Sequence, residues 1–296
     1  MANSQATIAT RPAEPGQAIV NPSASAPGQV LAAVRARAAQ ANPAVPAAEV
    51  DRWILHFVGN PERRRSLEDA LGRMARFEPL VRDALRRHGV PADLMYLPLI
   101  ESEFVETAVS HAGAAGMWQF MPGTARLNGL EVSAYVDERK DPVRATDAAV
   151  RHLADLYRQF GSWHLSLAAY NAGPVRVENA LRRHAAGARG DERLYWSIRP
   201  RLPSETRNYV PLFLAATEIA RAPRGFGLQP RPAAALAFAE VWVPGGTPLD
   251  VVAREHGVSG AALRQLNPHL VRGMTPPGRC WPVRVPPRPP ALTPLD

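Results

Sequence analysis

Glu101 has the surroundings in this sequence that most favour acid–base chemistry. It follows Leu97, Leu99 and Ile100 in a largely apolar segment, and a carboxyl group among aliphatic side chains has its ionised form disfavoured, which raises its pKa towards the range of a general acid. Glu103 lies two residues further on, about 200° around a helix, and would point away from whatever Glu101 faces. On position alone, the commoner role for Glu101 is structural, as a carboxyl group that accepts from helix-end amides or pairs with an arginine.

The patterns of other common catalytic sites do not occur. The eight histidines include no His-x-x-x-His pair, and the single cysteine, Cys280, cannot build a cysteine-rich zinc site or an internal disulfide. The sequence has neither a Gly-x-x-x-x-Gly-Lys phosphate loop nor a Gly-x-Ser-x-Gly nucleophile turn. We therefore expect carboxylate chemistry that uses no cofactor and no metal.

The helices that position Glu101 are predicted from their start and stop signals. Residues 1–48 are rich in Ala, Pro, Ser, Gln and Gly, which predicts a disordered leader. Asn60 and Pro61 are a cap and first-turn pair that begins a helix, and Leu80 to Leu85 predict a second amphipathic segment that ends at Gly89. Asp93 is then expected to cap a short, buried helix that ends at Glu101.

The rest of the chain divides at a proline-rich stretch. Asp141 begins a helix that Gly161 ends, residues 163–172 form a further helix, and Ser204 caps the last long one, which Pro211 interrupts. The central region therefore reads as all-α, with about eight helices. After residues 222–236, the sequence predicts a strand at 238–243, helices at 249–257 and 260–266, and a second strand at 281–285.

The formal net charge of +8 favours anionic partners, whether nucleic acid, a membrane surface or an acidic polymer. Arginine pairs and triplets such as Arg63–Arg65 are dispersed over predicted helices without interleaved aromatic residues, so we expect no nucleic-acid binding. No run of 18 apolar residues occurs, so we expect no transmembrane segment. Neither a signal peptide nor a lipidation cysteine is visible near residue 1.

Four motifs resemble those of the soluble-lytic-transglycosylase (SLT) domain, in the same order and at a similar spacing. They are Glu101-Ser102, the GAAGMWQFMP run from Gly113, the AYNAG run from Ala169 and the LPSETRNYV run from Leu202. The LPLIES sequence at 97–102 and the WQFMP run are most similar to the membrane-bound lytic murein transglycosylase D group, as are residues 53–92. The resemblance covers about residues 53–221 and implies a mainly α, lysozyme-like catalytic domain.

The resemblance also implies a role for each matching residue. Glu101 would be the single catalytic acid and base, and Tyr209 would hydrogen-bond its carboxyl group. The implied substrate-binding residues are Ser102, Met117, Trp118, Gln119, Tyr170 and Asn171. A lone carboxylate distinguishes this mechanism from that of glycosidases with paired carboxylates.

The C-terminal strand–helix–helix–strand unit resembles a divergent LysM module, a small glycan binder. Residues 249–267 also have the pattern of a helix-turn-helix, but the flanking strands argue against DNA binding. The usual Gly-Asp-Thr turn is missing, so a unit that only packs on its neighbour is the alternative. We thus expect a leader at 1–48, a catalytic domain at 49–221, a linker at 222–236, a LysM-like module at 237–288 and a tail at 289–296.

The resemblance implies a peptidoglycan lytic transglycosylase that would cleave the β-1,4 bond after N-acetylmuramic acid and form a 1,6-anhydro product. The alternatives are a hydrolytic muramidase on the same fold and a non-catalytic peptidoglycan-binding protein. We expect a monomer that binds glycan strands, and the substrate implies a location in the periplasm or cell envelope.

Overall fold

The computed structural model describes residues 45–287. The expectations for residues 1–44 and for the tail at 289–296 lie outside the described residues. The first helix, α2 (Ala47–Val58), begins inside the predicted leader, so the prediction is wrong for residues 47 and 48. Val50, Ile54 and Val58 form its buried face, and α2 packs on α10 (Ser204–Arg221).

The long helix α3 (Pro61–Arg87) begins where Asn60 and Pro61 predicted it. The Asn60 side chain accepts hydrogen bonds from the backbone N–H groups of Glu62 and Arg63. The two predicted helical segments are one continuous helix, because Pro79 lies inside it without ending it. A proline removes one backbone donor, and the buried apolar residues on both sides of Pro79 hold the two halves in one helix.

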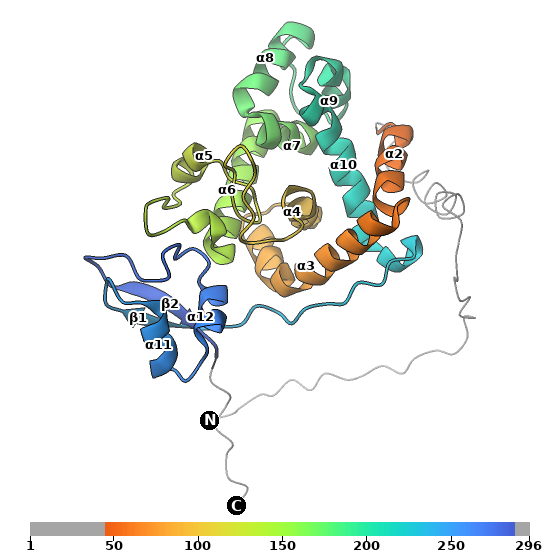
Figure 1. Cartoon of the computed structure of the whole chain (residues 1–296). Helices are drawn as coiled ribbons and strands as arrows, with labels where there is room; N and C mark the ends of the chain where they lie inside the picture. Colours follow the sequence, from red (N-terminus) through yellow and green to blue (C-terminus); the bar gives the residue numbers. More distant parts are fainter. Residues whose placement is uncertain (1–44, 288–296) are drawn as a thin grey trace, which may run out of the picture.

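Glu101 is carried by two short elements in the middle of the molecule. The 3₁₀ helix η1 (Ala92–Tyr96) leads into α4 (Leu97–Glu101), which lies among the longer helices in Figure 1. The prediction that Asp93 caps this segment is wrong. Its carboxylate pairs with Arg221 on α10, at 2.5 Å, so it joins two elements instead of capping the start of one.

The remaining helices confirm the mainly α fold class. They are α5 (Pro122–Leu127), η2 (Glu138–Lys140), α6 (Pro142–Phe160), α7 (Trp163–Ala172), α8 (Pro174–His184), α9 (Arg193–Ile198), η3 (Arg199–Arg201), α10 and η4 (Pro223–Phe226). Asp141 caps α6 and Gly161 ends it in a left-handed conformation, both as predicted. Helix α10 runs through Pro211 without the predicted interruption. No helix within residues 45–287 combines the length and the apolar character needed to cross a membrane.

The C-terminal unit has the predicted order of elements. Strand β1 (Ala239–Val243) and strand β2 (Trp281–Val285) form an antiparallel pair in which Val241 lies opposite Val283. Helices α11 (Leu249–Glu255) and α12 (Gly260–Leu266) connect them. Leu249, Val252 and Leu263 pack with the inward-facing strand residues into a hydrophobic cluster separate from the main core.

The segment between η4 and β1 runs below α3 in Figure 1 and leads into the C-terminal unit. The backbone N–H groups of Ala233 and Leu236 donate to the carbonyl oxygens of Gly72 and Arg76. A side chain at Gly72 would put its Cβ 2.5 Å from the carbonyl oxygen of Arg231. The proline-rich stretch is therefore held in place over part of its length.

The C-terminal unit also contacts the segment that precedes α6. Val136 packs into the C-terminal hydrophobic cluster, and the Asp137 N–H donates to the carbonyl oxygen of His269. The Arg284 guanidinium lies 2.8 Å from the carboxylate of Asp141, and both side chains are at most 5% exposed. A buried ion pair therefore joins β2 to the cap of α6.

Candidate active site

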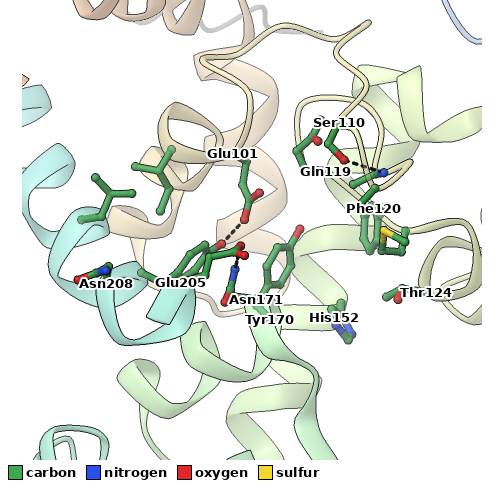
Figure 2. Close-up of a pocket in the computed structure, with 16 residues that line it drawn as sticks. Glu101, Ser110, Gln119, Phe120, Thr124, His152, Tyr170, Asn171, Glu205 and Asn208 are labelled. Atoms are coloured by element: carbon green, nitrogen blue, oxygen red, sulfur yellow. Dashed lines mark hydrogen bonds between the residues drawn. The ribbon is translucent and has the colours of Figure 1, made fainter. Parts of the chain in front are cut away.

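A cavity of about 540 Å³ opens beside Glu101. Its walls come from α4, from the loop that precedes α5, and from helices α6, α7 and α10. These elements are far apart in the sequence. In Figure 2, Glu101 points into the cavity from one side, Asn171 and Glu205 lie below it, and Gln119 and Ser110 lie on the loop across from it. Residues from all four sequence motifs thus meet around one carboxyl group.

The carboxyl group of Glu101 accepts a hydrogen bond from the Tyr209 hydroxyl. The pKa of Glu101 is raised from 4.5 to about 7. Burial is the largest cause, the Tyr209 hydrogen bond lowers the pKa in part, and the nearby charge of Glu205 adds to the rise. Burial also raises the pKa of Tyr209 well above its ordinary value, so the phenol stays a neutral donor. The site therefore holds a carboxyl group that can both donate and accept a proton near neutral pH.

The backbone that follows Glu101 is strained. Glu103 and Phe104 have φ angles of 53° and 59°, a left-handed region that non-glycine residues rarely occupy. Phe104 is fully buried and stacks on Phe77. The Glu103 carboxylate leaves the cavity and binds Ser66 and Arg73, as its position two residues after Glu101 predicted.

The loop across the cavity is held by one arginine and one glycine. The Arg139 guanidinium donates to the carbonyl oxygens of Gly113 and Phe120, and it pairs with Asp137 at 2.8 Å. Gly116 has a φ of 82°, and a Cβ at this position would lie 1.7 Å from the Arg139 carbonyl oxygen. Only glycine fits there, which explains the second glycine of the GAAG sequence.

Gln119, Tyr170 and Asn171 line the cavity. Gln119 also has a positive φ, of 47°, and its amide donates to the Gly116 carbonyl oxygen at 2.8 Å. The Tyr170 hydroxyl donates to the carbonyl oxygen of Trp118 at 2.7 Å. The amide nitrogen of Asn171 donates to Glu205 at 2.7 Å. Each side chain is thus fixed by a neighbour, as a preformed site requires.

Ser102, Met117 and Trp118 do not line the cavity, although the resemblance placed them at the substrate. Met117 and Trp118 are 1% and 0% exposed, and the Trp118 indole donates to Thr146 in the core. The Ser102 hydroxyl donates to the Met117 carbonyl oxygen at 2.9 Å. These side chains hold the loop against α4. Met117 and Trp118 face the apolar core, an orientation that the sequence alone did not show.

Two chemically active residues of the cavity had no predicted role. Glu205 places a second carboxylate in the cavity, where the sequence predicted a lone one. His152 of α6 packs its ring on Phe120 and Tyr170, and burial lowers its pKa. Glu205 lies inside the LPSETRNYV run, and that position is the signal that could have identified it.

Sequence comparisons show which known proteins this chain is similar to. The transglycosylase SLT domain family matches residues 79–191. The chain is 36% identical over 185 residues to membrane-bound lytic murein transglycosylase D of Escherichia coli K12, a match that covers 62% of this chain and 40% of that protein. It is also 36% identical over 120 residues to the soluble lytic murein transglycosylase of the same strain, with 39% of this chain and 18% of that protein covered.

Among solved structures, the 70 kDa soluble lytic transglycosylase of Escherichia coli matches with a TM-score of 0.40 and 28% identity, over 52% of this chain and 25% of that one. This overall similarity is low, so the assignment depends on the sequence matches. The chain spans less than half the length of these curated relatives. Residues 79–191, which carry Glu101, Gln119, Tyr170 and Asn171, are a transglycosylase SLT domain.

Proposed function

We propose that this protein is a peptidoglycan lytic transglycosylase in which Glu101 is both the acid and the base. The observation that carries the proposal is the Glu101 carboxyl group, which faces a cavity and has a pKa raised to about 7. Near neutral pH such a group exists in both protonation states, so it can give a proton and take one back in one cycle.

The reaction balances with no external reactant. Glu101 protonates the oxygen of the β-1,4 bond after N-acetylmuramic acid, and that bond breaks. The Glu101 carboxylate then removes the proton from the 6-hydroxyl of the same sugar as its oxygen bonds to the anomeric carbon. The product is a 1,6-anhydro ring, and Glu101 is protonated again. An intramolecular hydroxyl competes well with water because of its high effective concentration.

The neighbouring residues fit these two steps. Tyr209 donates a hydrogen bond to the Glu101 carboxyl group and so fixes its orientation. Gln119, Tyr170 and Asn171 present amide and hydroxyl groups around the cavity, which suit the hydroxyl and N-acetyl groups of a saccharide.

Paired variants test the choice of carboxyl group. Glu101→Gln removes the proton and little else, so it should abolish muropeptide release while the protein stays folded. Glu103→Gln is the matched control, because Glu103 binds Ser66 and Arg73 outside the cavity. An active Glu101→Gln protein beside an inactive Glu103→Gln protein would refute the assignment. A wild-type protein that binds glycan without turnover would support the non-catalytic alternative.

A hydrolytic muramidase is the second candidate, and Glu205 is the observation that favours it. A second carboxylate in the cavity could activate a water molecule, as in glycosidases with two carboxyl groups. Mass spectrometry separates the two products, because the anhydro product is lighter by one water. If the wild-type protein released products with reducing ends and the Glu205→Gln variant did not, the reaction would be hydrolysis instead.

The location and the domain organisation of the protein also belong to the proposal. Peptidoglycan lies outside the cytoplasm, so we infer a periplasmic or cell-envelope location. We also propose that the protein acts on glycan strands as a monomer. We propose a catalytic domain at 49–221 and a further unit at 237–288. Each contains a hydrophobic cluster of its own, although Phe226 and Leu228 extend the first cluster past residue 221 and Val136 joins the second. Glycan binding by the LysM-like unit stays a prediction, tested by sacculus pull-down of the full chain and of a chain that ends near Arg224.

A further inference from the structure

A second cavity, of about 470 Å³, lies where α7 turns into α8. We call it the arginine pocket, because Arg176 and Arg183 of α8 and Arg201 of η3 line it together with His184. No aspartate or glutamate is among its lining residues. Its volume lies within the range of ordinary ligand sites, and its wall carries only one sign of charge.

The three guanidinium groups have no anionic partner within residues 45–287. By contrast, Arg189 on the same side of the molecule does have one, since it pairs with Glu178 at 3.1 Å. Like charges that share a cavity repel one another, so an anion in the pocket would relieve this repulsion. Guanidinium groups bind carboxylates through two parallel hydrogen bonds, which makes a carboxylate a suitable ligand.

The arginine pocket lies next to the active-site cavity along two stretches of chain. Asn171 lines the active-site cavity, and the next two residues, Ala172 and Gly173, line the arginine pocket. Glu205 lines the active-site cavity, and Arg201, four residues earlier, lines the arginine pocket. In Figure 1, α8 and α9 lie beyond α7 on the side away from the C-terminal unit.

We propose that the arginine pocket binds the carboxylates of a peptide stem attached to the glycan in the active-site cavity. This inference rests on the proposed function, because it takes peptidoglycan as the substrate. A stem is covalently attached to N-acetylmuramic acid and carries free carboxylates, so it can leave the cavity beside Asn171 and reach Arg176 and Arg183. The pocket then contributes to substrate affinity and takes no part in the chemical step.

The test compares two substrates with the full-length protein. One is a glycan strand with intact stems, and the other is the same strand after its stems have been removed by an amidase. The double variant Arg176→Gln/Arg183→Gln should raise KM for the stem-bearing strand about tenfold, the effect expected from the loss of charge-assisted hydrogen bonds at an exposed site. The double variant should leave kcat on the stem-bearing strand unchanged. It should also leave kcat and KM on the bare strand unchanged.

Arg182→Gln is the matched control, since Arg182 precedes Arg183 and does not line the pocket. It should behave as wild type on both substrates. A third substrate, with its stem carboxylates converted to amides, should bind wild type as weakly as the bare strand does. That result identifies carboxylates and not another part of the stem as the bound groups.

Each outcome decides one question. A double variant that equals wild type on the stem-bearing strand overturns the inference. So does an equal loss on both strands, which would indicate a general effect of charge or folding. A wild-type protein that cleaves neither strand refutes the proposed function instead, so the two failures are distinguishable.

Discussion

Glu101→Gln should make the protein more stable, and the gain should grow with pH. A buried carboxyl group is cheap to keep neutral and costly to ionise, and glutamine has nearly the same shape without the ionisation. The pKa of Glu101 is about 7 in the folded protein against a reference value of 4.5. Between these two values the unfolded chain has lost the proton and the folded chain still holds it.

The sign and the size of the change in the free energy of unfolding follow from this difference in pKa. The folded state binds more protons than the unfolded state between pH 4.5 and 7, so stability falls as pH rises through this window. Each pH unit corresponds to about 1.4 kcal/mol, which gives about 3.4 kcal/mol for the full interval. Glu101 is partly exposed to the cavity, and water there reduces the cost, so we expect about 2–3 kcal/mol.

The measurement is the free energy of unfolding of both proteins in urea at pH 4.5, 6 and 8. Other ionisable groups are common to both proteins and cancel in the difference. The advantage of Glu101→Gln should increase by about 2–3 kcal/mol from pH 4.5 to 8. Glu103→Gln should give no such gain at pH 8, because it removes an exposed ion pair with Arg73. A difference that does not change with pH would mean that the pKa of Glu101 is near its ordinary value, and the acid–base argument would fail.

Three further variants test other parts of the structure. Tyr209→Phe removes the hydrogen bond that lowers the pKa of Glu101, so the alkaline limb of the pH–rate profile should move to higher pH while kcat falls about tenfold or more. Arg284→Met leaves the buried Asp141 carboxylate without its cation, while the backbone N–H groups of Val143 and Arg144 still donate to it. It should cost about 3–5 kcal/mol in urea unfolding, with part recovered when Asp141→Asn is added. Gly116→Ala forces a Cβ to within 1.7 Å of a carbonyl oxygen, so it should lower both the melting temperature and the activity, and wild-type values for both would contradict the close packing of Gly116 on Arg139.

Elements with local signals could be predicted from the sequence. The side chains of Asn60 and Asp141 cap helices as expected, because a cap binds backbone groups two or three residues away. The strands and helices of the C-terminal unit also have the predicted order. The division of residues 61–87 into two helical segments and the interruption at Pro211 were wrong, because packing on both sides of a proline outweighs the single lost hydrogen bond.

The site was predicted only in part, because its residues meet through the tertiary fold. The apolar run before Glu101 was enough to expect a raised pKa. The hydrophobic pattern around Glu205 does not show that α10 brings it into the same cavity, 104 residues further along the chain. Only its place in the LPSETRNYV run could have indicated this. Motif membership also failed to orient side chains, since Met117 and Trp118 belong to the motif and face the core.

The segment from Glu131 to Asp141 bears on both the cavity and the C-terminal unit. Through Arg139 it binds two carbonyl groups of the cavity loop. Through Asp141 it pairs with Arg284, and through Glu131 it pairs with Arg279 of the C-terminal unit. Removing the C-terminal unit therefore leaves the buried Asp141 without its cation, a few residues from the arginine that holds the loop. A loss of activity in a truncated chain would thus reflect the loop as well as any loss of glycan binding, and the Arg284→Met variant, which keeps the whole C-terminal unit, separates the two effects.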